Sequence, residues 1–333
     1  MAQYSIYTKM EDNNMKIKEL VIGENVNVTL VVTSATARET KAKKPFLALE
    51  LYDGTDTIFG NYWDWLGEKV PGKNSIVDIR AQVTEYMGVK QLNIKTMKLN
   101  TEKHLSEFSP VSAHDIGTIY KNAYASAIEI KDDLLRNLAV DILEQLRTKW
   151  LEVPGAKSVH HAFVGGTLVH CLSVANIAKS ISANIPQSND ELCFVGGLLH
   201  DLGKLFTYRL DGITVEMTDA GMLYEHTFIG AEFIGNFAEG QLWYNEDAME
   251  AKLEILRHII LSHHGLLEYG AAVPPLCVEA HVVSYADGVD ASVQQVIEQS
   301  AKKGEVKWTD KIYTLSNRPH LNTHYVKAVF SEN

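Results

Sequence analysis

Residues 196–204 read Gly-Gly-Leu-Leu-His-Asp-Leu-Gly-Lys, and they follow the apolar run Leu-Cys-Phe-Val of residues 192–195. This pattern predicts a buried helix that ends at His200 and Asp201. Burying the pair without partners would be costly, so a metal ion or a tight hydrogen-bonded network is needed around it. The stretch therefore predicts a helical domain with a polar centre in its interior.

Further histidines and aspartates lie where helices can bring them to the same point. They are His170, His226, His258, His263, His264 and Asp287. Each one alone is more simply an ordinary core or surface residue. The facing helices of a bundle commonly build metal sites from such side chains, however, and the glycines at 165–166 before His170 let a neighbouring segment approach closely. Taken together, the set indicates a metal site.

Residues 15–100 have the pattern of strands separated by turns. The predicted strands are 26–32, 46–52, 57–63, 75–83 and 90–95. Within 46–52 the alternation places Leu47, Leu49 and Leu51 on one face, and Asp-Gly at 53–54 predicts a hairpin turn. Five strands in this length predict a small closed barrel, for which an OB-fold is the preferred version.

Helical periodicity replaces strand alternation after a polar segment at 101–118, which is predicted to be a linker. Residues 132–143 are amphipathic, and similar segments recur to about residue 300. The predicted fold is multidomain, β plus α. An N-terminal OB-like five-stranded barrel at 15–100 is followed by an all-α helical bundle at 119–305 and a C-terminal tail at 306–333.

The charge and composition of the chain narrow its function classes. The 333 residues have a formal net charge of −11, which argues against a globally basic nucleic-acid binder. The first 110 residues hold 14 basic and 14 acidic side chains, so the excess acid lies in the C-terminal two thirds. Neither a membrane span nor a secretory signal is found, so a cytoplasmic location without membrane contact is expected. Cys171, Cys193 and Cys277 are predicted to be structural thiols.

The ordered set of His170, His200-Asp201 and Asp287 resembles the ligand set of the HD-domain metallophosphohydrolases. His226 with His263 resembles the additional pair of the two-metal members. The chain as a whole resembles the YhaM-type 3′→5′ exoribonucleases, which consist of an OB-fold followed by an HD domain. This wider resemblance also rests on His-His-Ala-Phe-Val-Gly-Gly at 160–166, Ile-Leu-Ser-His-His-Gly at 260–265 and the strands at 47–63. This resemblance spans about residues 15 to 315.

The resemblance implies a centre of two divalent transition-metal ions. His170, His200 and Asp287 would complete one site, His226 and His263 the other, and Asp201 would bridge them. The spacing alone leaves open which of His258, His263 and His264 takes the last position. Mixed imidazole and carboxylate ligands suit manganese, with iron, cobalt or magnesium as alternatives. Lys204, which could reach a phosphate oxygen as a point charge, is the second catalytic candidate beside Asp201.

Substrate contacts are predicted in both domains, because bases stack on exposed rings while lysines follow phosphates. The candidates are His160, His161 and His264 in the helical domain, and Tyr62, Trp63, Lys43 and Lys44 in the barrel. The remaining barrel aromatics are Phe46, Tyr52, Phe59, Trp65 and Tyr86. Only two or three rings of the barrel are expected on the binding face.

The expected activity is metal-dependent 3′→5′ exonucleolytic hydrolysis of single-stranded RNA to 5′-nucleotides, with single-stranded DNA as a further substrate. A homo-oligomer is expected. One alternative is an HD phosphohydrolase that acts on free nucleotides. Another is a nucleic-acid-binding replication or regulatory factor whose metal site is structural. Discrimination between RNA and DNA depends on a contact to the 2′-hydroxyl, for which the sequence has no readable motif.

Overall fold

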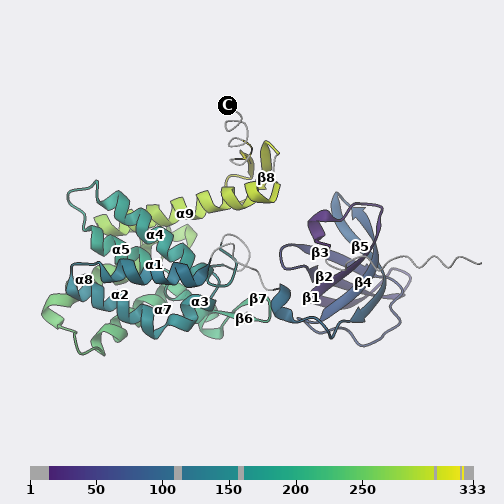
Figure 1. Cartoon of the computed structure of the whole chain (residues 1–333), viewed down its shortest axis with the longest axis horizontal. Coiled ribbons are helices and arrows are strands. Elements are labelled where there is room, and N and C mark those ends of the chain that lie inside the picture. The colour runs from purple at the N-terminus through teal and green to yellow at the C-terminus, as the bar shows by residue number, and fades with distance from the viewer. Residues whose placement is uncertain (1–14, 109–114, 157–160, 304–305, 323–324, 326–333) are drawn as a thin grey trace, which may run out of the picture. The chain divides into compact units, whose positions relative to one another are not determined.

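The structure is a computed structural model that describes residues 15–108, 115–156, 161–303, 306–322 and 325. It divides into two compact units, one built on a β-barrel and the other on helices (Figure 1). The predicted N-terminal extension, residues 1–14, lies outside the described residues.

The barrel is closed and has the strand order β1-β2-β3-β5-β4. Its strands are β1 (Asn25–Glu39), β2 (Pro45–Tyr52), β3 (Thr57–Tyr62), β4 (Ile76–Tyr86) and β5 (Val89–Leu99), preceded by a short 3-10 turn, Ile17–Glu19. β3 and β5 pair in parallel, while the other neighbouring strands of the barrel pair antiparallel. This five-stranded topology is OB-like and confirms the predicted barrel.

The alternation in β2 fills the barrel core as the sequence predicts. Leu47, Leu49 and Leu51 are buried, and the residues between them are half-buried. Asp53 organises the following turn, because its carboxylate accepts hydrogen bonds from the backbone N–H groups of Ile17 and Asp56. Although burial acts to raise the pKa of Asp53, these hydrogen bonds hold it below its usual value.

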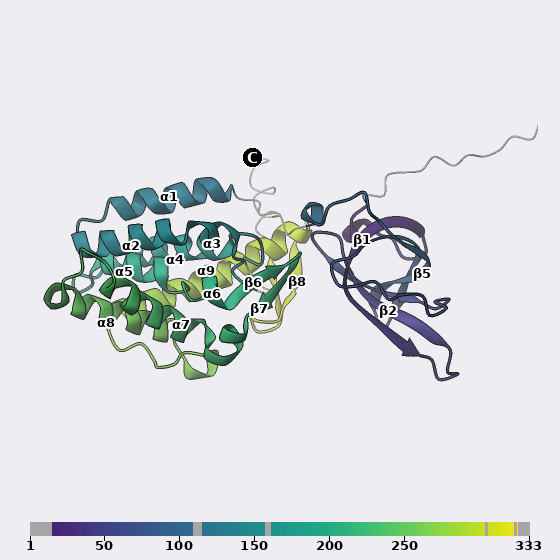
Figure 2. The same cartoon turned by 90° about the horizontal axis from the view of Figure 1, so that it is seen from below.

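The second unit is mainly helical. Its helices are α1 (Ile116–Ile128), α2 (Asp133–Gln145), α3 (Arg147–Glu152), α4 (Gly166–Ser182), α5 (Asp190–Leu199), α6 (Lys204–Thr207), α7 (Asp219–Glu239), α8 (Glu246–Ser262) and α9 (Val278–Lys303), with a 3-10 turn at Leu267–Tyr269. α1 lies on the outside of this unit and packs on α2, α3 and α4 (Figure 2). α5 is central, because it contacts α2, α4, α8 and α9.

The predicted helical second domain is confirmed, with two small hairpins in addition to its helices. The hairpins are β6 (Tyr208–Asp211) with β7 (Thr214–Met217), and β8 (Trp308–Ile312) with β9 (Arg318–Leu321). Asp-Gly at 211–212, a strong hairpin signal, connects the first pair. The second pair lies within the predicted C-terminal tail.

Within the predicted linker, residues 101–118, the structure describes regular elements at both ends. Leu105–Phe108 forms a 3-10 turn whose Phe108 packs with Val31 and Ile76 of the barrel. At the other end, α1 begins at Ile116, where Asp115 accepts the backbone N–H of Thr118 as an N-cap. Among the described residues, none of the helices is long and apolar enough to cross a membrane.

Candidate metal centre

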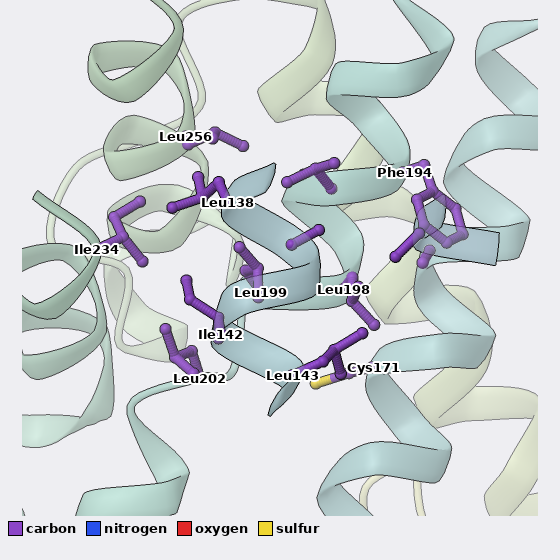
Figure 3. Close-up of a cluster of buried hydrophobic side chains, with 14 of the residues drawn as sticks. Leu138, Ile142, Leu143, Cys171, Phe194, Leu198, Leu199, Leu202, Ile234 and Leu256 are labelled. Carbon is purple, nitrogen blue, oxygen red and sulfur yellow. The ribbon is translucent and has the colours of Figure 1, made fainter. Parts of the chain in front are cut away.

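His200 and Asp201 stand at the end of α5, as the sequence predicts, and the hydrophobic core fixes their position. Leu198, Leu199 and Leu202, on either side of the pair, are fully buried in the cluster that Figure 3 shows. Both His200 and Asp201 are themselves buried. Because the leucines are immobilised by close packing, the polar pair has little freedom to move.

Two glycines of α5 let the neighbouring helices approach the pair. A Cβ at position 197 would lie 2.7 Å from Ala175 Cα of α4, and one at 196 would lie 2.7 Å from Ile259 Cδ1 of α8. The close approach of α4 brings His170 to His200, with ring centroids 5.0 Å apart. α8 brings His263, whose ring centroid lies 4.7 Å from that of His200.

The two carboxylate oxygens of Asp201 face different groups of ligands. Oδ2 lies 3.4 Å from Nε2 of His170 and 3.4 Å from Nε2 of His200. Oδ1 lies 3.4 Å from Nε2 of His226 and 3.7 Å from Nε2 of His263. One carboxylate therefore stands between two sets of imidazoles.

Asp287, on α9, completes the first set. Its Oδ1 lies 3.2 Å from Nε2 of His170 and 3.9 Å from Nε2 of His200. The structure thus brings together all six residues that the sequence selected as metal ligands, from α4, α7 and α9 and from the residues that follow α5 and α8.

His226 reaches the centre through an unusual backbone. The preceding residue, Glu225, interrupts α7 with φ 61° and ψ 159°, a conformation that costs a non-glycine residue on the order of 1–3 kcal/mol. Gly203 is needed here as well, because a Cβ on it would lie 1.9 Å from the carbonyl oxygen of His226. The sequence placed His226 near the start of a helix, whereas the structure places it after this kink in a helix that begins at Asp219.

The structure gives different surroundings to His258, His263 and His264, whose roles the sequence left open. His263 and His264 both lie in the centre, and Nε2 of His264 is 3.1 Å from Nε2 of His226. One potential ligand atom from each of His226, His263 and His264 lies within 4.8 Å of the others. His258 instead accepts the backbone N–H of Leu276 at 2.8 Å through Nε2. The geometry therefore makes His264 a candidate ligand as well as a candidate substrate contact.

Hydrogen bonds to the outer ring nitrogens orient two of the imidazoles. Nδ1 of His200 donates to the carbonyl of Gly197 at 2.7 Å, and Nδ1 of His263 donates to that of Ile260 at 2.8 Å. A proton on Nδ1 of the neutral ring leaves the Nε2 lone pair free to bind a cation. Both Nε2 atoms point towards Asp201.

The charges in the centre also suit cation binding. Burial acts to raise the pKa of Asp201, but Lys204 and His200 hold it well below its usual range. Burial lowers the pKa of His226 to about 3, so this ring is neutral at pH 7. For His170 burial acts in the same direction, but hydrogen bonds to Asp287 and Asp290 raise its pKa to about 9. A cation at Nε2 of His170 would displace that proton.

Two buried atoms provide a direct test of whether a metal fits. Among the described residues, neither Oδ1 of Asp201 nor Nε2 of His263 has a hydrogen-bond partner. They lie 3.7 Å apart, and an unsatisfied buried polar group is costly. A divalent ion between them would satisfy both, so the residues present fit a metal at this position.

Asp290 is a residue of the centre that sequence reasoning missed. Its Oδ2 lies 2.7 Å from Nδ1 of His170 and 2.9 Å from Nε2 of His161, and its Oδ1 accepts the hydroxyl of Ser173. The signal was present, because Asp290 follows Asp287 by three residues and so lies on a neighbouring face of the same helix. Carboxylates in this position fix the orientation of a metal-binding histidine.

This geometry corrects the prediction that His161 contacts phosphate. Its side chain is buried behind His170 and bonded to Asp290, so it does not face a substrate. Gly166 permits this arrangement, because a Cβ there would lie 1.9 Å from the carbonyl oxygen of His161. The other residue of the predicted pair, His160, lies outside the described residues.

We expect Asp290→Asn to weaken metal binding about 10- to 100-fold while preserving most of the activity at saturating metal. The amide cannot accept from two imidazoles and a hydroxyl as the carboxylate does, so His170 loses its orientation. Titration of activity against metal concentration measures this shift, with Asp190→Asn on the exposed start of α5 as the matched control. An unchanged metal dependence would show that Asp290 does not position His170.

Lys204 differs from the expectation of a side chain free to reach phosphate. Its Nζ lies 2.7 Å from Oδ2 of Asp201 and donates to the carbonyl of Gly155 at 2.9 Å. Burial acts to lower the pKa of Lys204, but Asp201 raises it overall. In this structure the ammonium therefore neutralises the central carboxylate.

The helical unit contains a segment that matches a known protein family. Residues 167–292 match the HD domain family. These residues form an HD domain. The match begins three residues before His170 and ends two residues after Asp290, so it encloses every described candidate ligand. An HD domain indicates a metal-dependent phosphohydrolase, and domains of this family bind divalent metals.

Three similar solved structures each cover about a quarter of the chain. A domain of replication protein A from Methanococcus maripaludis is 23% identical with a TM-score of 0.23, covering 26% of this chain and 92% of that one. The second OB-fold domain of the same protein is 21% identical, also at 0.23, covering 27% and 96%. A replication protein A heterotrimer bound to ssDNA is 16% identical at 0.22, covering 28% and 67%. The OB-like fold is therefore assigned from the strand topology of the barrel and not from these similarities.

The barrel candidates for substrate binding have different exposures. Trp63 is 40% exposed and stacks on Phe46 with ring centroids 4.4 Å apart. Tyr62 is half-buried against the barrel core. Lys43 and Lys44 are exposed in the turn between β1 and β2, where Lys44 pairs with Asp64 at 3.2 Å.

The other barrel aromatics divide between core and surface. Phe59 and Tyr86 are exposed. Trp65 packs against the barrel core and donates its ring N–H to the carbonyl of Glu68. Trp63, Phe59 and Tyr86 are thus the most exposed of the candidate rings.

Proposed function

We propose that this protein is a metal-dependent 3′→5′ exoribonuclease that hydrolyses single-stranded RNA to 5′-nucleotides, with single-stranded DNA as a further substrate. The observation that carries the proposal is the placement of Asp201, whose two oxygens face separate sets of imidazoles. A shared carboxylate between two ligand sets could hold two ions close together, as two-metal phosphodiester hydrolysis requires.

The residues suggest how two ions would be held. His170, His200, Asp201 and Asp287 would hold one, and Asp201, His226 and His263 would hold the other. Manganese is our first choice for both by the resemblance to the YhaM-type exoribonucleases, and the mixture of imidazole and carboxylate ligands also suits iron or a similar first-row ion. When bound, the two ions would supply Lewis acidity and an activated water for attack on phosphorus.

The chain's own residues would prepare the centre for this chemistry. Asp290 would keep His170 aligned through Nδ1, and the backbone carbonyls of Gly197 and Ile260 would keep His200 and His263 aligned. Lys204 balances the charge of Asp201. Its ammonium would be available to a phosphate oxygen if Oδ2 of Asp201 were taken by a cation.

The exposed side chains of the barrel favour a polymeric substrate over a free nucleotide. Bases stack on exposed aromatic rings, and lysines nearby can contact phosphates, which together suit a single strand. Trp63, Phe59 and Lys43 provide such groups in the barrel. The HD domain, which lies in the acidic part of the chain, would then provide the hydrolytic centre.

Hydrolysis of free nucleotides is a second candidate, because all the candidate ligands lie in the helical unit and none in the barrel. One experiment separates the possibilities. The purified protein is incubated with Mn²⁺ and 5′-end-labelled RNA, single-stranded DNA or free nucleotides. We expect stepwise shortening of the labelled RNA with release of 5′-nucleotides. Hydrolysis of free nucleotides alone would replace the proposal, and RNA binding without hydrolysis of any substrate would favour a binding factor with a structural metal.

We expect Trp63→Ala to weaken binding of single-stranded RNA about 5- to 150-fold, because stacking is worth about 1–3 kcal/mol per base. Fluorescence anisotropy with chelator present measures the Kd without hydrolysis. Trp308→Ala is the matched control, because Trp308 is a similarly exposed tryptophan of the helical unit. Equal affinities of the two variants would remove Trp63 from the proposed binding face.

A further inference from the structure

α9 carries an exposed apolar stripe that the metal centre does not use. Tyr285, Val289, Val293 and Ile297 follow each other at intervals of four residues and are 69%, 46%, 51% and 42% exposed. His281 extends the stripe by one more interval, with its ring stacked on that of Tyr285 at 6.3 Å between centroids. In Figure 1, α9 runs along one edge of the helical unit. Residues four apart form a continuous ridge along a helix.

The stripe has no charged side chain. Between Ala280 and Ile297 the sequence contains only two charged residues, Asp287 and Asp290, and both turn into the metal centre. The outer face of this helix is therefore uncharged over about four turns, whereas solvent-facing helix surfaces normally carry charged residues. An exposed apolar surface of this kind marks an interaction site.

Gly288 adds an independent observation at the middle of the stripe. Among the described residues, nothing lies within 4 Å of a Cβ built on Gly288, and its φ is helical. Glycine inside a helix costs about 1 kcal/mol relative to alanine, and no packing within the chain requires it here. A glycine on an open helix face permits another backbone to approach closely from outside.

We propose that this stripe is the contact between two copies of the chain, packed as an antiparallel pair of α9 helices about a two-fold axis near Val289. The stripe is symmetric about this residue, so the axis would place Tyr285 of each copy against Val293 of the other. A two-fold contact sets each group against itself or its symmetry mate. An uncharged surface avoids the repulsion between like charges that such a contact otherwise creates.

The geometry of the ridge agrees with a helix pair. Ridges of residues four apart interdigitate in the commonest class of helix packing, with axes about 8–10 Å apart. Gly288, next to the axis, would allow the helices to reach that separation.

The neighbouring helix α4 enlarges the surface. Ile177 and Ile181 pack against the cluster that includes Val282 of α9, so they border the stripe. With Asn176, Ser180 and Asn184 they line a shallow hollow of about 410 Å³ that is also uncharged. This extension matters because stable dimers bury about 1,200–2,000 Å² in total, more than one helix stripe provides.

The test is the mass of the full-length protein in solution. Sedimentation equilibrium is expected to give twice the chain mass of 37.1 kDa. Val289→Lys places two ammonium groups beside the axis and is expected to weaken the dimer at least about 100-fold. Asn236→Lys, on an exposed position of α7, adds the same charge elsewhere and is expected to leave the mass unchanged.

Gly288→Leu separates loss of contact from loss of folding. Leucine favours the helix more than glycine does, so the melting temperature of the isolated chain should not fall, whereas the dimer should dissociate. Val289→Cys is expected to form a disulfide-linked dimer under mild oxidation, and Asn236→Cys is not. A monomeric wild-type protein, or a dimer that survives both Val289→Lys and Gly288→Leu, would overturn the proposal.

Discussion

Asp201→Asn is expected to reduce metal-dependent hydrolysis at least about a thousandfold, which corresponds to about 4 kcal/mol of transition-state stabilisation. Asparagine keeps the shape of the side chain but offers one neutral oxygen instead of two charged ones. Since the two oxygens face different sets of imidazoles, one proposed site loses its oxygen ligand and the other keeps only a neutral one, so both sites are weakened at once. Each metal is expected to contribute several kcal/mol, so losing both accounts for an effect of this size.

The fold should survive the Asp201→Asn substitution, although it will be less stable. Lys204 loses its buried partner, which is destabilising, but it keeps its hydrogen bond to Gly155. The helical circular dichroism spectrum should remain, because Leu198, Leu199 and Leu202 anchor this segment in a large core (Figure 3). Asp190→Asn on the same helix should retain full activity. If the Asp201 variant kept more than about a tenth of the activity, the bridging role would be wrong.

The parts of this protein that depend on local pattern are predictable from the sequence. The alternation of Leu47, Leu49 and Leu51 predicts the inner face of β2, and the apolar run before His200 predicts a buried helix that ends at His200 and Asp201. Both predictions are confirmed. They depend only on the periodicity of apolar residues and on the flanking residues, which are local properties of a few sequence positions. The barrel class follows from counting such segments.

The parts that depend on distant contacts are not predictable in this way. The need for glycine at position 203 arises from a contact with the backbone of His226, more than 20 residues away and next to the kink at Glu225. Whether His161 faces substrate or Asp290 likewise depends on how the loop before α4 packs on α9. A histidine has similar sequence surroundings in either role, so only the three-dimensional structure separates them.

The same limit applies to Lys204. Its position three residues after Asp201 allows either an ion pair with that carboxylate or a contact with phosphate, because both lie within reach of a flexible four-carbon chain. The structure shows the ion pair at 2.7 Å. The sequence contains the residue and its approximate location, but the partner that it chooses depends on which other charges reach the same oxygen.

His226→Ala is expected to lower the metal content from about two ions per chain to about one and to reduce hydrolysis at least about 100-fold. His226 belongs to the set around Oδ1 of Asp201, whereas the set around Oδ2 keeps His170, His200 and Asp287. Removing one imidazole should therefore empty one site and leave the other filled. Elemental analysis of gently purified protein measures the ratio directly.

His258→Ala provides the matched control for His226→Ala. It removes an imidazole that bonds to the backbone of Leu276 and takes no part in the centre, so the content of two ions should remain. Equal loss of metal in both variants would indicate general destabilisation instead of a lost ligand. A wild-type protein that saturates at one ion with full activity would contradict the two-site arrangement. Asp201 would then be an ordinary ligand of a single metal, and the unsatisfied Nε2 of His263 would need another partner.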